Sequence, residues 1–106
     1  MQEYIKNFQI SDSFWNRYET LIKEVVIPYQ EKALHDEISG AEKSHAIANF
    51  KAAADYLKTG KKNADFYGMV FQDSDVAKWL EAVAYVLVLF PDAELEKRAD
   101  EMIDLI

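Results

Sequence analysis

The chain has 106 residues, of which 50% are hydrophobic, and it carries a formal net charge of −7 and no cysteine. A chain of this length forms one domain or part of one, and its hydrophobic share is large enough for a packed core. The negative charge argues against nucleic-acid phosphates and anionic membrane surfaces as partners, and the lack of cysteine excludes disulfides, thiolate zinc sites and cysteine nucleophiles within these residues.

Residues 1–10 alternate apolar and polar side chains, which is a weak strand signal. We therefore expect a short extended segment at the N-terminus. The same residues contain no basic start followed by an apolar run, as a signal peptide would, so we expect a cytoplasmic protein. The longest uncharged apolar stretch, residues 82–90, is far shorter than the roughly 20 residues that span a bilayer.

A first helix is predicted to begin at Phe14, because the hydroxyl of Ser13 can accept a hydrogen bond from a free amide of the first turn. Pro28 lacks an amide hydrogen and crowds the preceding turn, so we expect a kink or a break near Ile27. The pattern leaves open whether the helix resumes as far as Ile38. The apolar residues that recur at helical spacing are Phe14, Tyr18, Leu21, Ile22, Val25 and Val26.

A second helix is predicted after Ser44, which is its expected cap. Residues 60–63 contain glycine and polar residues and break the pattern. Residues 66–72 are expected to form a loop, in which Gly68 indicates a turn or a close approach of the backbone. The apolar face of this second helix consists of Ile47, Phe50, Ala54 and Leu57.

Residues 73–75, Asp-Ser-Asp, are expected to start a third helix over residues 75–90. Its second half is apolar on all sides, so we expect it to be buried on most sides. A strand at residues 86–90 is less favoured, because the apolar pattern is continuous with Trp79. Pro91 suits the first turn of a fourth helix, where its missing amide costs nothing. The stripe of that helix is Leu95, Ala99, Met102, Ile103 and Ile106.

Asp73 and Asp75 are the candidate carboxylates of the chain. A glycosidase needs one acid and one base or nucleophile, about 5 to 9.5 Å apart. Their spacing within a helix-start triplet favours helix capping and interaction with the helix dipole instead. Helix capping is therefore the favoured role of Asp73 and Asp75, and lining or supporting a substrate pocket is the alternative.

Three further residues are candidates for contact with a substrate, and each has an alternative role. Tyr67 is the aromatic residue for which stacking on a sugar is favoured over core packing. Gln72 lies between a loop and a helix start, so its amide can bind a ligand hydroxyl or satisfy the backbone of the loop. His45 can lie near a sugar, although support for the start of the second helix is the favoured role.

Glu42 and His45 have the i, i+3 spacing of a di-iron ligand pair. Such a site needs a second copy of the pair and two more glutamates on facing helices, and the sequence contains one copy of the pair. A small metal-dependent helical enzyme is therefore the least favoured hypothesis. We expect no metal site in this chain.

Residues 66–81, with the sequence FYGMVFQDSDVAKWLE, resemble a block near the N-terminus of bacterial β-L-arabinofuranosidases of glycoside hydrolase family 127. The resemblance covers nearly the whole chain. One departure is Ala77, where many relatives carry tyrosine, which puts in doubt any contact of that ring but not the helix. Shorter matching stretches occur in the same order and at similar spacing, at residues 14–15, 26–30, 44–50 and 91–95.

The resemblance implies a six-hairpin (α/α) barrel followed by β-sandwich domains, and retaining hydrolysis of terminal β-L-arabinofuranosides. It also implies a cysteine nucleophile in a zinc site formed with further cysteines and a glutamate, with a second glutamate as general acid. All of these residues lie beyond Ile106 in family members. We therefore expect no catalytic residue and no cofactor in this chain; zinc and an arabinose-containing oligosaccharide are implied as ligands of the full-length protein.

The sequence therefore predicts a mostly α chain of about four helices in two α/α hairpins, forming a single partial domain over residues 1–106. We expect the third helix inside an (α/α) barrel, with residues 68–74 facing its substrate end. On this hypothesis the chain is a scaffold fragment of a glycoside hydrolase and is inactive alone. The alternative is a free-standing helical binding or assembly module without catalysis, which would self-associate through exposed apolar helix faces.

Overall fold

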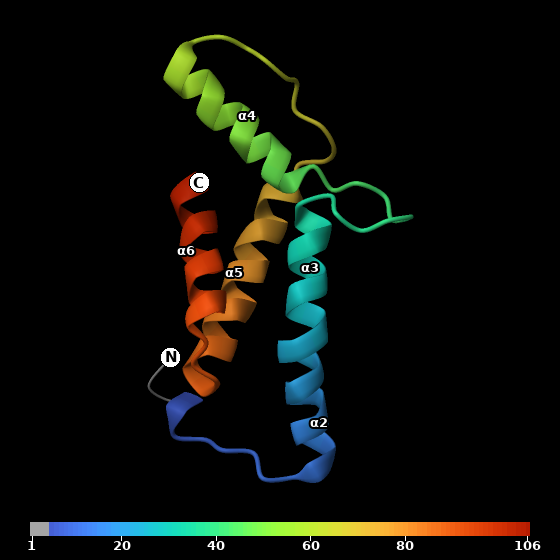
Figure 1. Ribbon diagram of the computed structural model, residues 1–106, viewed down its shortest axis with the longest axis vertical. Helices are drawn as coiled ribbons and strands as arrows, with labels where there is room; N and C mark the ends of the chain where they lie inside the picture. The colour runs from blue at the N-terminus through green and yellow to red at the C-terminus, as the bar shows by residue number, and fades with distance from the viewer. Residues whose placement is uncertain (1–4) are drawn as a thin grey trace.

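The computed structural model describes residues 5–106, and Figure 1 shows them as helices joined by long loops. No strand occurs in these residues, so the predicted mostly α fold is confirmed. None of the helices described is long and apolar enough to cross a membrane. In chain order they are α2 (Ser13–Leu21), the π-helix η1 (Ile22–Val26), α3 (Ile27–Leu34), α4 (Ala46–Thr59), α5 (Gln72–Leu89) and α6 (Ala93–Leu105).

The beginning of the chain differs from the expectation. The weak strand signal does not produce a strand in the part that the structure describes: Ile5 and Lys6 lie in a helical turn, and residues 8–12 have no regular secondary structure. Residues 1–4 of the predicted extended segment lie outside the described residues. The rest of the described chain offers no strand with which an alternating segment could pair, and an isolated strand is unstable in water.

The helices α2, η1 and α3 join end to end into one rod, here named the α2–α3 rod. Of the predicted kink or break near Ile27, the break does not occur, because the rod continues through Pro28 to Leu34. The π-helix lies directly before the proline, and the amide of Ile27 donates to the carbonyl of Ile22, five residues earlier. A wider turn at this point makes room for a ring that would otherwise crowd the preceding turn of an α-helix.

Aspartate side chains cap α2 and α6. The Oδ1 atom of Asp12 accepts hydrogen bonds from two amides of the first turn of α2 at 2.9 and 3.1 Å. The predicted cap Ser13 is instead the first helical residue, because the extended backbone angles typical of a cap occur at Asp12. Asp92 caps α6 through two amides at 3.1 and 3.0 Å, and Pro91 lies outside the helix, not in its first turn.

Substitution of Asp92 by alanine is expected to lower the free energy of unfolding by about 1 kcal/mol, because two amides of α6 lose their acceptor. Urea unfolding followed by circular dichroism measures this difference. Asp100→Ala is the matched control, since Asp100 is exposed on the same helix away from its N-terminus. Equal effects of the two substitutions would show that the cap contributes nothing.

The start of α4 also differs from the prediction. His45 precedes the helix with a left-handed backbone (φ 56°), and no side chain caps it, so Ser44 is not the cap. The end of α4 is as expected. Gly60 adopts φ 68° and its amide donates to the carbonyl of Tyr56 at 2.8 Å, which confirms the predicted break at residues 60–63.

The loop after α4 contains an exposed ion pair between Lys62 and Asp65. The hydrogen bond from Lys62 and its positive charge hold the pKa of the Asp65 carboxyl below its usual range. Both side chains are largely exposed, so salt screens their attraction and the pair contributes little to stability.

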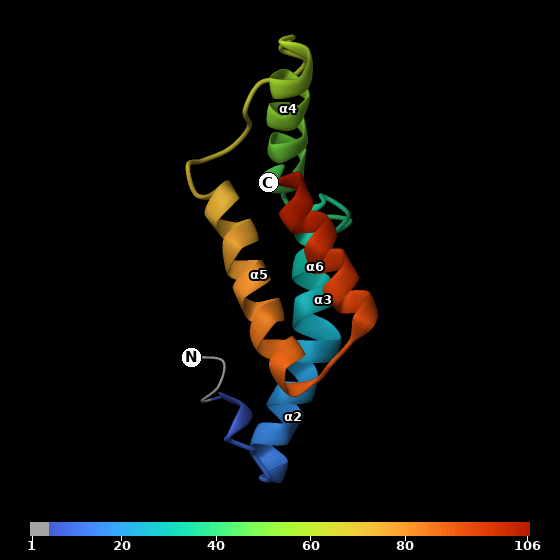
Figure 2. The same ribbon diagram turned by 90° about the vertical axis from the view of Figure 1, so that its left-hand side faces the viewer.

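The central helix of the fold is α5, which packs against α3, α4 and α6. Figures 1 and 2 show α5 and α6 side by side and antiparallel, so the second predicted hairpin is confirmed. The first predicted hairpin, between the α2–α3 rod and α4, has a different geometry. Both views show α4 extending beyond the end of α3 instead of running back along it, and its main contacts are with α5 and α6.

The core lies where α3, α5 and α6 meet the start of α4. Burial along α5 follows one face, so the expectation of a second half that is buried on most sides is wrong for this chain: Ala84 and Leu89 are exposed. The buried hydrophobic residues are Ile27, Leu34, Ala46, Ile47, Val76, Trp79, Val83, Val86, Leu95, Ala99 and Met102.

Two polar contacts tie the α2–α3 rod to the later helices. The indole Nε1 of Trp79 donates a buried hydrogen bond to the carbonyl of Ile27 at 3.0 Å, so this large side chain enters the core without an unsatisfied donor. Arg98 of α6 donates through Nε to the carboxylate of Glu31 at 3.1 Å. These contacts fix α3 against α5 and α6.

Candidate functional site

Four polar and aromatic residues meet where the end of α3, the start of α4 and the loop before α5 come together. We name this group, Asp36, His45, Asn49 and Tyr67, the α4 corner. Figure 1 shows that the loop from α3 to α4 and the loop from α4 to α5 both pass beside the first turn of α4. The corner contains His45 and Tyr67, two of the five candidates from the sequence.

A carboxylate fixes the position of His45. Asp36 Oδ1 accepts a hydrogen bond from the backbone amide of His45 at 2.9 Å, and Asp36 Oδ2 lies 3.7 Å from Nδ1 of the same histidine. Both residues have left-handed backbones, with φ of 62° and 56°. Such angles are uncommon outside glycine but are more frequent for Asp and His, and the contacts between the two residues stabilise them here.

The ring of Tyr67 lies on the imidazole of His45, with the ring centroids 4.1 Å apart. The side-chain amide of Asn49 holds the backbone of Tyr67 at both polar atoms. Asn49 Nδ2 donates to the carbonyl of Tyr67 at 2.8 Å, and Asn49 Oδ1 accepts from its amide at 3.1 Å. Tyr67 itself remains 52% exposed, so the corner presents an oriented aromatic ring to the outside.

Gln72 lies next to this group along the chain, at the first position of α5. Its side chain lies against Gly68, which has φ of 100°, and a Cβ atom at Gly68 would come within 2.6 Å of Gln72 Cδ. This confirms the close approach predicted for Gly68. Gln72 Oε1 is buried and has no hydrogen-bond partner within residues 5–106, so in this conformation it is an unsatisfied acceptor that is closed to solvent.

Asp73 and Asp75 do not form a carboxylate pair with a shared partner. Asp73 Oδ1 accepts from the amide of Ser74 at 2.7 Å, whereas Asp75 Oδ1 pairs with Lys78 Nζ at 3.3 Å. The expected capping is also wrong in detail, because Phe71 precedes α5 and no side chain caps the helix. Both carboxylates lie in the first turn of α5, where the helix dipole favours negative charge.

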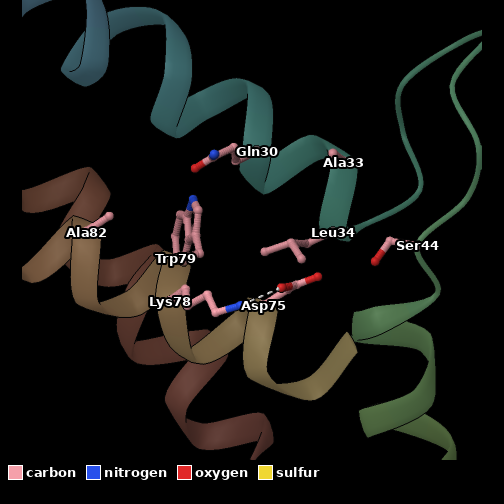
Figure 3. Close-up of a pocket in the computed structure, with 8 residues that line it drawn as sticks. All are labelled: Gln30, Ala33, Leu34, Ser44, Asp75, Lys78, Trp79 and Ala82. Atoms are coloured by element: carbon pink, nitrogen blue, oxygen red, sulfur yellow. Dashed lines mark hydrogen bonds and ion pairs between the residues drawn. The ribbon is translucent and has the colours of Figure 1, made fainter. Parts of the chain in front are cut away.

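Asp75 lies at the edge of a hollow of about 540 Å³ between α3 and α5, shown in Figure 3. Gln30 and Trp79 face each other across it, and Ser44 from the loop before α4 closes one end. Trp79 is only 2% exposed, and its Nε1 is already bonded, so its ring offers no face on which a sugar could stack. The hollow is therefore a weaker candidate for a sugar site than the α4 corner.

Metal binding finds no support in the described residues. No group of three or more His, Asp or Glu side chains comes together among residues 5–106, and Glu42 and His45 therefore lack further ligands. The zinc site that the family resemblance implies needs cysteine thiolates, and the chain contains no cysteine. The residues present do not fit that zinc centre.

Asp36 and Asn49 are the functional candidates that the sequence interpretation missed. Asp36 falls within a short run that reads as a solvated helix end, and Asn49 reads as a helix residue with no special role. Their partners are 9 and 18 residues away in sequence, so no local spacing pattern connects them. The matching stretch at residues 44–50 was the only signal that included either residue.

A family model for the catalytic domain of GH127 β-L-arabinofuranosidases matches residues 7–106. With the helical fold, this match defines the chain as part of a glycoside hydrolase catalytic domain. The chain belongs to the β-L-arabinofuranosidase family GH127. The resemblance found at residues 66–81 is therefore confirmed.

Two similar proteins extend this result. The chain is 45% identical to the non-reducing end β-L-arabinofuranosidase of Bifidobacterium longum subsp. longum over 94% of its length. It is 55% identical to a crystallised GH127 β-L-arabinofuranosidase from Geobacillus stearothermophilus T6, with a TM-score of 0.79 over 92% of the chain. It spans 16% of the first protein and 14% of the second. Because the chain spans so small a part of both relatives, the comparisons favour the scaffold hypothesis over a free-standing module.

Proposed function

We propose that the chain supplies part of the helical scaffold of an enzyme that removes terminal β-L-arabinofuranosyl groups from oligosaccharides. The observation that supports this most directly is the 55% identity to the Geobacillus enzyme together with a TM-score of 0.79. Sequence and helix arrangement agree over nearly the whole chain, so a related role is the simplest conclusion.

The groups that break the glycosidic bond are proposed to lie outside these residues. The two candidate carboxylates from the sequence, at the start of α5, have different partners: Ser74 for Asp73 and Lys78 for Asp75. The described residues also supply no ligand set for zinc. We therefore assign the reaction centre, and any zinc in it, to the much longer part of the family protein that this chain does not span.

The α4 corner is proposed to form part of the wall that faces the sugar. Tyr67 presents an exposed ring whose orientation is fixed by Asn49 and His45, and an aromatic face packs well on the apolar face of a pentose. Gln72 follows in the adjacent helix turn, and its buried, unpaired Oε1 can receive a hydrogen bond from a sugar hydroxyl once the side chain turns outward.

The proposal is tested by a chimera in which this chain replaces the matching N-terminal region of the Geobacillus enzyme. We expect the chimera to release p-nitrophenol from p-nitrophenyl β-L-arabinofuranoside, and the 106-residue chain alone to release none. A chimera that folds with normal thermal stability but does not hydrolyse this substrate would contradict the proposed function. Turnover by the chain alone would contradict the assignment of the reaction centre.

Substitution of Tyr67 by alanine in the chimera is expected to raise KM about tenfold, because a stacking contact with the sugar is lost. Tyr67→Phe keeps the ring and should change KM less than about threefold. Steady-state kinetics on the arabinofuranoside measures both. Tyr56→Ala is the matched control, because Tyr56 is equally exposed, at 52%, but lies on α4 outside the corner. An unchanged KM for Tyr67→Ala would remove Tyr67 from the sugar wall.

A further inference from the structure

Asp36 follows α3 in a backbone conformation that glycine usually provides. Its amide donates to the carbonyl of Ala33 at 3.1 Å, and the amide of Glu37 donates to the carbonyl of Lys32 at 2.9 Å, which is the pattern of a Schellman motif. Asp36 occupies the left-handed position of this motif, with φ of 62°. Glycine is the usual residue there, because a Cβ atom is strained at such angles. An aspartate at this position indicates that its carboxylate has a role.

Both carboxylate oxygens of Asp36 face His45. Oδ1 accepts from the backbone amide of His45 at 2.9 Å, and Oδ2 lies 3.7 Å from Nδ1 of the ring. Lys43 does not compete for the carboxylate, because its Nζ donates to the backbone carbonyl of Asp36 at 3.0 Å. The side chain of Asp36 is only 15% exposed, so water screens its charge less than it would at an open surface.

The two ring nitrogens of His45 have different surroundings. In a neutral imidazole one nitrogen carries the proton and the other accepts hydrogen bonds. A carboxylate can only accept, so Asp36 favours the tautomer with the proton on Nδ1. Nε2 has no hydrogen-bond partner among the residues that the structure describes. It is also open to solvent, because Gln72 Oε1 is the one buried side-chain nitrogen or oxygen without a partner in that part of the chain.

We propose that Asp36 is a positioning residue, which holds the proton of His45 on Nδ1 so that Nε2 accepts a hydrogen bond from a hydroxyl of a sugar bound at Tyr67. The inference rests on the proposed function for the sugar. The imidazole lies against Tyr67, with the ring centroids 4.1 Å apart and the ring planes tilted by 48°. A sugar that packs on the tyrosine therefore brings its hydroxyls beside the imidazole. Tyr67 supplies contact area, and His45 fixes the orientation of the sugar.

A structural role of Asp36 alone explains less of this geometry. The bond to the backbone amide of His45 needs only a neutral acceptor, such as the amide oxygen of asparagine. Asparagine also adopts left-handed backbone angles readily. The second oxygen beside Nδ1 is the part of the arrangement that a negative charge serves, and it acts on the imidazole ring.

The first experiment records the nitrogen-15 signals of the two histidine rings of the isolated chain, at mildly alkaline pH, where histidine rings are neutral. His35 is an internal reference, because its Nδ1 lies 2.9 Å from the carbonyl of Glu31. A carbonyl only accepts, so Nδ1 of His35 carries the proton. We expect the same pattern for His45, with Nε2 unprotonated. A proton on Nε2 of His45 in the unsubstituted chain would overturn the proposal.

Asp36→Asn is the decisive substitution in the same experiment. The asparagine Oδ1 can keep the bond to the amide of His45, whereas Nδ2 donates toward Nδ1 of the ring. We therefore expect His45 to move its proton to Nε2, His35 to remain unchanged, and the melting midpoint to stay the same. An unchanged His45 pattern would overturn the proposal. Asp55→Asn is the matched control, because it removes the same charge at an exposed position of α4 outside the corner.

The second experiment measures KM of the chimera for p-nitrophenyl β-L-arabinofuranoside. Asp36→Asn should raise KM about fivefold, because one hydrogen bond to the sugar is lost, and should change kcat less than about twofold. In a His45→Asn chimera, where residue 45 has no tautomers, adding Asp36→Asn should change KM less than about twofold. An equal increase of KM in both backgrounds would show a purely structural role of Asp36 and would overturn the proposal.

The two experiments separate this inference from the proposed function. A folded chimera without hydrolysis would contradict the proposed function and the sugar contact with it, whereas the nitrogen-15 pattern of the isolated chain still tests the tautomer. A reversed tautomer in Asp36→Asn together with an unchanged KM would overturn the hydrogen bond to the sugar.

Discussion

Substitution of Trp79 by alanine is expected to lower the free energy of unfolding of the chain by about 3–5 kcal/mol. Trp79 is 2% exposed and lies in the core between α5 and α3, where its Nε1 donates to the carbonyl of Ile27. The substitution removes a large apolar side chain and leaves a cavity. Since small domains are stable by only about 5–15 kcal/mol, most of the chain should unfold at moderate urea concentrations.

The second tryptophan of the chain provides the matched control. Trp15 is 57% exposed on α2, so Trp15→Ala should change the free energy of unfolding of the isolated chain by no more than about 0.5 kcal/mol. Trp79→Phe fills most of the space but lacks the donor, and should cost an intermediate amount. Urea titrations followed by circular dichroism measure all three. A similar cost for the two alanine variants would show that Trp79 does not hold α3 against α5.

Substitution of Gly68 by alanine is expected to cost about 2 kcal/mol, the second largest effect. Gly68 has φ of 100°, a backbone angle that residues with a Cβ adopt only under strain. The new methyl group would also meet the side-chain amide of Gln72. Because Asn49 holds the neighbouring Tyr67 through two hydrogen bonds, the loop cannot relax without breaking contacts in the α4 corner.

A double-mutant cycle separates the two causes. Gln72→Ala alone should be close to neutral, because Gln72 Oε1 is buried without a partner in the described residues and its removal relieves an unsatisfied acceptor. Gly68→Ala combined with Gln72→Ala removes the steric contact but keeps the backbone strain. The double variant should therefore recover only part of the loss. Full recovery of the free energy of unfolding in the double variant would mean that φ at Gly68 causes no strain. An unchanged free energy of unfolding for Gly68→Ala alone would contradict the loop geometry.

Local patterns in the sequence were sufficient for the three later helices. The apolar spacing in α4, α5 and α6 predicted each element to within a few residues, because a helix that buries one face must repeat its apolar residues every three or four positions. The break at Gly60 and the close approach at Gly68 were also predicted, since glycine allows backbone angles that other residues avoid. The block at residues 66–81 was sufficient to indicate the family.

The structure differed from the predictions where two choices had similar local support. Asp12 and Ser13 are both good capping residues, and the backbone angles decide in favour of Asp12. Pro28 predicts a break in an α-helix, but the chain widens into a π-helix ahead of it and continues. The buried bond from Trp79 to Ile27 holds the rod at this point, and no pattern within the rod itself reveals that bond.

The sequence by itself determined that this chain is helical, where its later helices lie and which family it resembles, because each of these depends on residues close together along the chain. Only the tertiary structure decided which side of the α2–α3 rod is buried, and that Asp36, His45, Asn49 and Tyr67 meet in one corner. These residues come from separate segments, and their contacts form only when the helices pack against one another. Side-chain spacing shows that a helix has an apolar face, but packing decides which apolar face is covered.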